Sequence, residues 1–576
     1  MTAAIAATTG GNTANVAAGP ARSITCLLNM GRSIADHLNF LYGPGADSTL
    51  EPRLRQLIAK YFPISEPEPG VRQGLPLTEY DAILITYADQ VRDEGEPPLG
   101  TLGAFLAMHA SGDVSGVHLL PFYPSSSDDG FSVIDYYAVD PVVGGWDDLA
   151  SVGSRFQLMF DAVFNHVSAQ SEWFKAFLRQ DDRFRSWFIT VDGDPDLSQV
   201  VRPRALPLLT PFKTALGEKK VWTTFSGDQV DLNLHDPEVL LALTDVLMFY
   251  VARGARFVRL DAIAYLWKEI GTPCIHLPQT HRVVQLWRSL LDMVAPQVML
   301  ITETNVPHRD NVSYFGDGTN EAQLVYNFAL PPLVLHSLST GSGEALSRWA
   351  AALSVPSSGV TFFNFLASHD GVGVSPARGI LTEAEIVRLV ERALKHGGLV
   401  SYRNNPDGSK SPYELNINYF DALSDPASDE PVGTQIDRFV VAHAMMLAMP
   451  GVPGIYFHSL FGSRGDQAGA RSSGIPRRIN RQKFLRRDLE RELADPSSLR
   501  ARVLSGLTTL LMKRRASAAF HPSARHKVLD VDPRVFALER TSRDGRHSVL
   551  CLHNLTDQRV RAADDVLDPY EVRWLS

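Results

Sequence analysis

Eight short apolar runs separated by helical patterns predict an α/β fold, a (β/α)₈ TIM barrel with two loop insertions and a small C-terminal antiparallel β-domain. Near-continuous apolar runs are typical of strands that are buried on both faces, as the parallel strands of a barrel are. Between the runs lie helical patterns such as that from Pro237 to Arg253, where apolar residues recur every three or four positions. The predicted barrel strands are 83–87, 116–122, 156–164, 257–263, 298–304, 323–328, 360–367 and 454–457.

The uneven spacing of these runs predicts the rest of the domain organisation. About 90 residues separate the third run from the fourth, which far exceeds an ordinary loop and indicates an inserted subdomain. Short alternating runs after residue 515 indicate the antiparallel β-domain. We expect a flexible leader (1–23), N-terminal helical decoration (24–78), a first barrel part (79–166), an inserted subdomain (167–235), the continued barrel (236–370), a second insertion (371–435), the barrel end (436–514) and the β-domain (515–576).

Composition and charge exclude several classes of protein. The 576 residues include 55 Lys plus Arg against 64 Asp plus Glu, and the net charge of −9 argues against a surface that coats nucleic acid. No apolar run approaches the roughly 20 residues that span a bilayer. Three scattered cysteines, Cys26, Cys274 and Cys551, argue against a disulfide framework or a zinc knuckle, and the first 22 residues lack a signal-peptide pattern. We therefore expect a cytoplasmic protein without nucleic-acid or membrane partners.

Ionisable side chains lie in or just after six of the eight runs, at the end of the barrel where active sites form. Any one of them could cap a strand or join a loop salt bridge, but six runs with such groups are harder to explain that way. Three of the carboxylates, Asp261, Glu303 and Asp370, belong to the fourth, fifth and seventh strands, and paired carboxylates across a cleft are the groups that glycosidic bond chemistry needs. The full set is Asp89, His118, Asp161 with Asn165 and His166, Arg259, Asp261, Glu303, His369 and Asp370.

Several of these residues stand in segments that resemble the four sequence regions of the α-amylase-like superfamily, in the same order and spacing. The segments are DAVFNH (161–166), FVRLDAIAY (257–265), LITETN (300–305) and NFLASHD (364–370). The chain is more similar still to the sucrose phosphorylase branch, through LITYADQ (84–90), LLPFYPSSSDDGFSVIDY (119–136), RPRALPL (202–208) and RRINR (477–481). Within that branch it looks most like the glucosylglycerate phosphorylases, through RPRALPLLTPF (202–212), CIHLPQTH (274–281) and TETNVPHRDN (302–311).

The resemblance implies a retaining double displacement without a cofactor or a metal. Asp261 is then the nucleophile, Glu303 the general acid/base and Asp370 the carboxylate that stabilises the transition state. Glu303 must begin protonated, which requires burial and a nearby negative charge, whereas Asp261 must stay ionised, with Arg259 on the same strand face to hold it so. Retention predicts that the carboxyl groups of Asp261 and Glu303 lie about 5–5.5 Å apart.

The resemblance also implies the residues that bind the substrates. The predicted sugar contacts are Asp89, His118, Phe131, Arg259, His369 and Arg477, with Asp89 and Arg477 at one end of the glucose. For His118 and His369 the alternative is a structural histidine, and for Arg477 a solvated surface. The predicted phosphate and acceptor contacts are Arg204, Phe225, Gln229, Asn305, Tyr413 and Glu414. Arg202 and Arg204 could instead serve only to anchor the insertion.

The four shared regions do not separate a phosphorylase from a hydrolase. Phosphate at about 10 mM must compete with water at about 55 M, which demands about 5 kcal/mol of selective stabilisation. Arg204 is suited to supply it, because a guanidinium contacts phosphate through two parallel hydrogen bonds. Asn305 and Glu414 stand where sucrose phosphorylases carry His and Gln, which argues against fructose as the leaving group. The closer resemblance to the glucosylglycerate phosphorylases implies glycerate instead.

Several alternatives remain open at this point. The substrate could be sucrose, sucrose 6-phosphate or glucosylglycerol, or the chain could be a retaining α-glucoside hydrolase or transglucosidase. A catalytically dead barrel that serves as a binding subunit is disfavoured, because Asp261, Glu303 and Asp370 are all present. The oligomeric state is not visible in the sequence, and a homodimer is one option.

Overall fold

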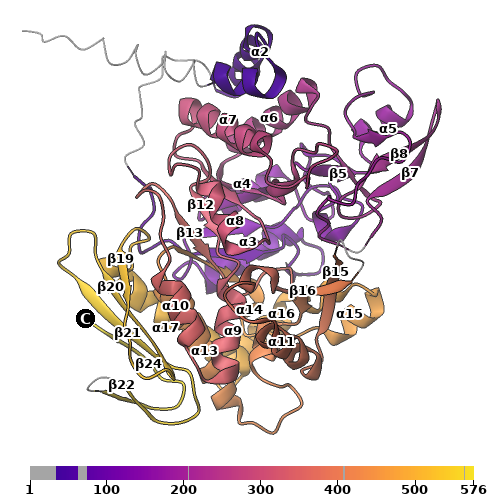
Figure 1. Cartoon of the computed structure of the whole chain (residues 1–576). Helices are drawn as coiled ribbons and strands as arrows, with labels where there is room; N and C mark the ends of the chain where they lie inside the picture. Colours follow the sequence, from indigo (N-terminus) through magenta and orange to yellow (C-terminus); the bar gives the residue numbers. More distant parts are fainter. Residues whose placement is uncertain (1–33, 63–73, 205, 406–408, 563–564) are drawn as a thin grey trace, which may run out of the picture.

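The predicted barrel is present in the computed structural model, which describes residues 34–62, 74–204, 206–405, 409–562 and 565–576 (Figure 1). Eight parallel strands form a closed barrel in which each strand pairs with the preceding and the following barrel strand of the chain. All eight apolar runs became barrel strands. They are β1 (Ile83–Thr86), β3 (Gly116–Leu119), β4 (Gln157–Ala162), β10 (Ala255–Leu260), β11 (Met299–Thr302), β12 (Leu324–Tyr326), β13 (Thr361–Asn364) and β17 (Val452–Tyr456). The leader expected at 1–23 lies outside the described residues.

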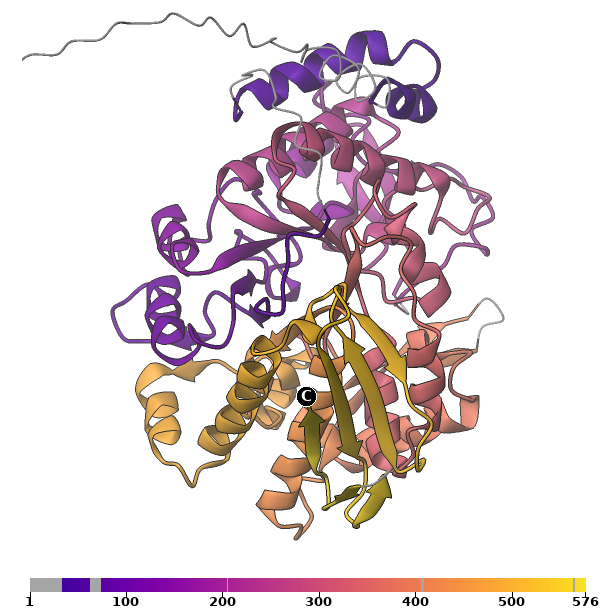
Figure 2. The same ribbon diagram turned by 90° about the vertical axis from the view of Figure 1, so that its left-hand side faces the viewer.

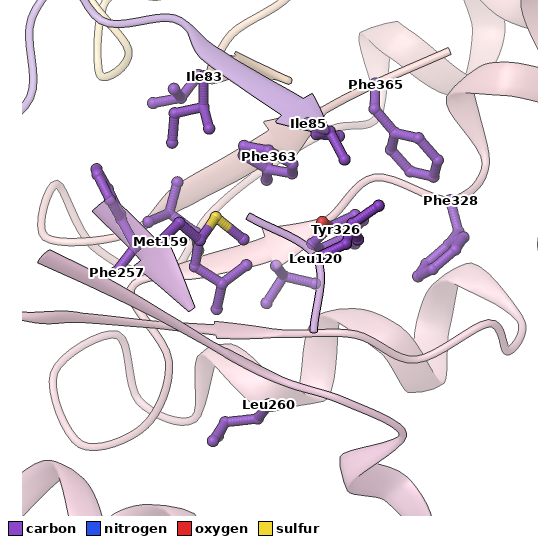
Figure 3. Close-up of a cluster of buried hydrophobic side chains, with 14 of the residues drawn as sticks. Ile83, Ile85, Leu120, Met159, Phe257, Leu260, Tyr326, Phe328, Phe363 and Phe365 are labelled. Carbon is purple, nitrogen blue, oxygen red and sulfur yellow. The ribbon is translucent and has the colours of Figure 1, made fainter. Parts of the chain in front are cut away.

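Large apolar side chains fill the barrel and make it a packed core. Figure 3 shows Ile83, Ile85, Met159, Phe257 and Phe363 gathered between the strands, and each is at most 1% exposed. The strand register above this core sets the positions of the polar residues. Arg259 on β10 pairs with Asp161 on β4, and His118 on β3 pairs with Ile85 on β1. Polar groups of successive strands therefore meet at one end of the barrel.

Helices cover the outside of the barrel, as the pattern between the apolar runs predicts. The predicted helix at Pro237 is α6 (Pro237–Ala252), which begins where the side chain of Asp236 accepts a hydrogen bond from the backbone N–H of Glu238. The other long helices around the barrel are α3 (Pro98–His109), α7 (Pro278–Val294), α9 (Leu330–Thr340), α13 (Val432–Ala448) and α17 (Leu499–Arg515).

Two long segments between barrel strands carry small antiparallel sheets of their own. Between β4 and α6 lie α5 (Glu172–Leu178), the pair β5 (His166–Ser168) with β9 (Gln229–Asp231), and a sheet of β6 (Thr190–Val191), β8 (Gly217–Trp222) and β7 (Leu209–Thr214). Between β13 and α13 lie β14 (Val372–Gly373), α11 (Glu383–Lys395) and a hairpin of β15 (Leu399–Asn404) and β16 (Lys410–Asn416).

The first helical part of the described chain lies at the top of both views, and the C-terminal sheet lies in the lower half (Figures 1 and 2). Helix α2 (Asp47–Ala59) packs against α6, and its Arg53 pairs with Glu238. The predicted C-terminal antiparallel sheet is present as β19 (Arg525–Val528), β20 (Val535–Thr541), β21 (Ser548–Asn554) and β24 (Val572–Leu575), and it packs beside α13. Within the described ranges, no helix is long and apolar enough to cross a membrane.

Candidate active site

The carboxyl ends of β4, β10 and β11 bring three carboxylates around one guanidinium. Asp261 follows β10 directly, and its backbone N–H donates to the carbonyl of Ala162 at the end of β4 (3.1 Å). The guanidinium of Arg259 contacts Asp161, lies 2.8 Å from Asp261 and lies 3.9 Å from Glu303. Arg259 is only 2% exposed. A buried cation thus lies between carboxylates that would otherwise repel one another.

The environments of Asp261 and Glu303 point to different protonation states. Burial raises the pKa of both carboxyl groups, and the negative charges of neighbouring carboxylates add to this effect. Two close carboxylates in a dry pocket share a proton, because both cannot be charged at once at low cost. Asp261 is the closer of the two to Arg259, and the charge of this guanidinium opposes the effect of burial on the pKa of Asp261. Glu303 accepts a hydrogen bond from the backbone N–H of Ala262 (3.0 Å), which lowers its pKa, but its contact with Arg259 is longer. The shorter contact with Arg259 favours Asp261 as the ionised member of the pair, which leaves the shared proton on Glu303.

Asp370 has the environment of a permanently ionised carboxylate. Arg477 lies 2.6 Å from it, and Arg481 lies 3.5 Å from it. Burial alone would raise its pKa, but the charges of Arg477, Arg481 and Arg259 together lower it well below its usual range. A carboxylate that stays ionised in the pocket can stabilise positive charge on a sugar ring.

Two of the predicted histidines are held by neighbours and stay neutral. His118 Nε2 lies 2.7 Å from Asp161, and both side chains are fully buried. The ring of His369 stacks on Phe131 with a centroid distance of 4.7 Å and an angle of 6°. Burial lowers the pKa of both histidines, that of His369 to about 3. Neutral imidazoles can exchange hydrogen bonds with sugar hydroxyls without adding charge.

One pocket collects most of the predicted residues. Among the described residues, the buried polar atoms without a hydrogen-bond partner include Asn305 Oδ1 and His369 Nδ1, which belong to residues that line the pocket, and His118 Nδ1 and Arg259 Nε, whose side chains contact Asp161. Buried polar groups normally have partners, so these atoms are suited to bind the hydroxyl groups of a sugar and its acceptor. The predicted residues that line the pocket are Phe131, Arg204, Phe225, Gln229, Asp261, Glu303, Asn305, His369, Asp370, Tyr413 and Arg477.

The side of the pocket predicted to bind the acceptor is aromatic and basic. The guanidinium of Arg204 lies over the ring of Phe225 at 5.7 Å, and Phe225 packs edge-on against Tyr265. The side-chain amide of Gln229 donates to the carbonyl of Phe131 (3.1 Å). Tyr413 comes from β16 of the hairpin, so a segment far along the chain closes this side of the pocket.

Two predicted contacts have other partners in the structure. Asp89 pairs with Lys483 (2.5 Å) and Arg92, whereas Arg477 contacts Asp370. Glu414 is 1% exposed and binds Arg477 through both carboxylate oxygens (2.9 and 2.7 Å). The sugar role of Asp89 and the acceptor role of Glu414 stay predictions.

Sequence reasoning missed three residues at the site. Asp128 and Tyr265 line the pocket, and Arg481 donates to the carbonyl of His369 (2.9 Å) beside Asp370. Asp128 and Arg481 lie in segments 119–136 and 477–481, which resemble the sucrose phosphorylases. The sequence motifs therefore included these two residues but did not indicate that they belong to the site. No group of three or more His, Cys, Asp or Glu residues in the described part of the chain is placed to hold a metal ion.

The chain is similar to known proteins in family, sequence and fold. The family described as the catalytic domain of α-amylase matches residues 112–370. The glucosylglycerate phosphorylase of Allomeiothermus silvanus is 51% identical over 94% of this chain and 98% of its own length. That of Spirochaeta thermophila is 50% identical over 90% of this chain and 88% of its own length. A crystal structure of sucrose 6F-phosphate phosphorylase from Thermoanaerobacter thermosaccharolyticum superimposes with a TM-score of 0.74 at 25% identity, over 88% of this chain and 99% of that one.

Proposed function

Because the chain belongs to the α-amylase family, in the group of the glucosylglycerate phosphorylases, we propose that it is a retaining glucoside phosphorylase. Its reaction is the reversible phosphorolysis of 2-O-(α-D-glucopyranosyl)-D-glycerate to α-D-glucose 1-phosphate and D-glycerate. The observation that carries the proposal is the single pocket that holds three carboxylates, suited to glycosidic bond cleavage, together with Arg204, suited to bind an anion.

In the first displacement, the carboxylate of Asp261 attacks the anomeric carbon of the glucosyl group. The bond from this carbon to the glycerate oxygen breaks, and the leaving oxygen takes the proton of Glu303. The product is a β-glucosyl ester of Asp261. Asp370, kept ionised by Arg477, stabilises the positive charge that develops on the ring, and Arg259 holds Asp261 ready as an anion.

In the second displacement, a phosphate oxygen attacks the same carbon from the opposite face. The ester bond to Asp261 breaks, and the proton of the attacking phosphate passes to Glu303, which is now a carboxylate. Two inversions return the α configuration in glucose 1-phosphate. The enzyme is then in its starting state, so the reaction can also run in reverse.

Arg204 supports phosphate as the acceptor in preference to water. A phosphate dianion close to Asp261 and Asp370 is repelled unless a cation is near, and the guanidinium of Arg204 lines the pocket. Asn305 Oδ1, buried and without a donor among the described residues, is suited to accept a hydrogen bond from a hydroxyl of glycerate. Arg204 can also attract the carboxylate of glycerate, since the two acceptors use the same space in turn.

The test is incubation with glucosylglycerate in the presence and absence of phosphate. The proposal predicts glucose 1-phosphate that forms only when phosphate is present, with little free glucose. Free glucose released at an equal rate without phosphate would make the chain a hydrolase.

The same proposal extends to the partners, the cellular location and the oligomeric state of the enzyme. Its partners are the small molecules of the reaction. We propose that it works in the cytoplasm and forms a homodimer. Cys274 and Cys551 are both buried free thiols, which suits a reducing compartment. Fractionation of cells and light scattering on the purified protein test location and assembly.

A further inference from the structure

The side chain of Asn305 lies against a glycine of β14. A Cβ atom added at Gly373 would lie 2.6 Å from Asn305 Oδ1, 2.7 Å from Nδ2 and 2.9 Å from Cγ, and these are the three heavy atoms nearest to it. We propose that Gly373 is a positioning residue that holds the amide of Asn305 in place in the pocket and thereby sets the affinity of the enzyme for glycerate. This inference rests on the proposed function, in which Asn305 binds a hydroxyl group of glycerate.

Space, and not backbone conformation, is what requires a glycine at this position. Gly373 does not have a positive φ, so its backbone is one that other residues also adopt. Carbon atoms in ordinary contact lie about 3.5–4.0 Å apart, so a methyl group at Gly373 would overlap the amide of Asn305. Both terminal atoms of the amide are too close, so a half-turn of the amide group does not relieve the overlap. The side chain of Asn305 therefore has to move when residue 373 carries a side chain.

Strand β14 is held in place on its other side, so it does not move away from Asn305 freely. Gly373 pairs with Glu414 of β16 in an antiparallel ladder. The backbone N–H of Val374 donates to the carbonyl of Tyr413 (3.1 Å), which lines the pocket. Movement of β14 would break these contacts with the hairpin. The amide of Asn305 is thus the group that yields to an added side chain.

The position of this amide decides where an acceptor finds a hydrogen bond. Asn305 lines the pocket, and its Oδ1 is buried without a hydrogen-bond partner among the described residues. Contact with Gly373 is therefore the close packing that positions this oxygen. A hydroxyl group that enters the pocket gives Oδ1 the partner that a buried acceptor needs. An amide displaced from Gly373 presents Oδ1 elsewhere, and the acceptor loses that hydrogen bond.

The effect should be confined to the substrate that donates a hydroxyl group at this place. The phosphate group of glucose 1-phosphate, as a dianion, only accepts hydrogen bonds, so it gains nothing from Oδ1. Glycerate has hydroxyl groups that donate. The competing explanation is that Gly373 serves only the packing of β14 on β16. It predicts similar changes for both substrates, because the hairpin and the pocket then shift together.

The test compares Gly373→Ala with the wild type in the synthetic direction, through the KM for glycerate and the KM for α-glucose 1-phosphate. We expect the KM for glycerate to rise about tenfold, the order of effect for one lost hydrogen bond, and the KM for glucose 1-phosphate to change less than about twofold. Asn305→Ala is the matched control, because it removes the amide directly and should show the same split. An unchanged KM for glycerate in either variant, or an equal rise for both substrates in Gly373→Ala, would overturn the proposal.

A double-mutant cycle separates the positioning of Asn305 from any other role of Gly373. In the Asn305→Ala background, Gly373→Ala should change the KM for glycerate less than about twofold, because the amide is already gone. A further rise of about tenfold there would overturn the proposal. If Gly373→Ala alone fails to fold by circular dichroism, the double variant decides: it should fold, because the overlap is gone, and its failure to fold would refute the inference. A wild type that transfers no glucose from glucose 1-phosphate to glycerate would instead refute the proposed function.

Discussion

Arg477 joins Glu414 to Asp370: one edge of its guanidinium binds both carboxylate oxygens of Glu414, and Asp370 lies 2.6 Å from it. Glu414 belongs to β16, and Tyr413, its neighbour on that strand, lines the pocket. The hairpin is thus tied by an ion pair to Arg477, which also contacts Asp370, the proposed transition-state stabiliser. Glu414 also balances part of the charge of Arg477, whose field acts on Asp370 and Glu303.

Replacing Glu414 by Gln should shift the pH dependence of the reaction. Burial raises the pKa of Glu303 and Arg477 lowers it, so an Arg477 without its anionic partner lowers it further. Glucosyl transfer needs protonated Glu303, so activity is lost as the pH rises through that pKa. We expect the basic limb of the kcat/KM profile to move to lower pH in Glu414→Gln. A basic limb that does not move would show that Glu414 has no effect on the acid/base residue.

Replacing Asp261 by Asn should abolish turnover and leave the fold intact. The change removes the nucleophile and keeps its shape, and loss of a nucleophile typically costs about 10⁴-fold or more in kcat. The measurement is initial rate together with the thermal midpoint. Glu303→Gln is the matched control, because it should also lose activity with glucosylglycerate but regain the first displacement with α-glucosyl fluoride, whose leaving group needs no proton. Near-wild-type activity in Asp261→Asn would contradict the nucleophile assignment.

Replacing Arg204 by Gln should separate phosphorolysis from hydrolysis. Without this guanidinium, phosphate loses its cation in the pocket, whereas water does not need one. We expect the KM for phosphate to rise about tenfold or more and the ratio of glucose 1-phosphate to glucose to fall. Arg204→Lys keeps the charge and loses the planar geometry, so its KM for phosphate should lie between that of the wild type and that of Arg204→Gln. A product ratio unchanged in Arg204→Gln would exclude Arg204 as the phosphate ligand.

Replacing Lys268 by Met should destabilise the protein. The Lys268 ammonium lies 2.6 Å from Asp231 and 2.6 Å from Asn165 Oδ1, and all three side chains are at most 5% exposed. Removal of one partner leaves Asp231 as a buried charge, which typically costs about 3–5 kcal/mol in the free energy of unfolding. Chemical denaturation of the wild type and the variant measures this cost. A difference below about 1 kcal/mol would mean that Asp231 is hydrated or finds another partner.

The barrel could be predicted from the sequence because its signal is local. Each strand is a run of consecutive apolar residues. Because the strands are parallel, the polar residues that follow each run lie at the same end of the barrel, independent of the length and conformation of the loops. The acceptor side depends on loops, whose contacts join residues far apart in the sequence. The pair of Asp89 with Lys483, that of Glu414 with Arg477 and the left-handed backbone at Asp128 have no local pattern that predicts them. The sequence therefore predicted which segments build the site better than which side chains meet in it.

The most direct test of the central claim is an acceptor screen in the synthetic direction. Purified enzyme is supplied with α-glucose 1-phosphate and, separately, with glycerate, glycerol, fructose and fructose 6-phosphate, and the release of phosphate is followed. Glycerate should give the highest kcat/KM and an α-linked product. A preference for any of the other three acceptors would contradict glycerate as the natural acceptor, and no release of phosphate with any acceptor would contradict the phosphorylase itself.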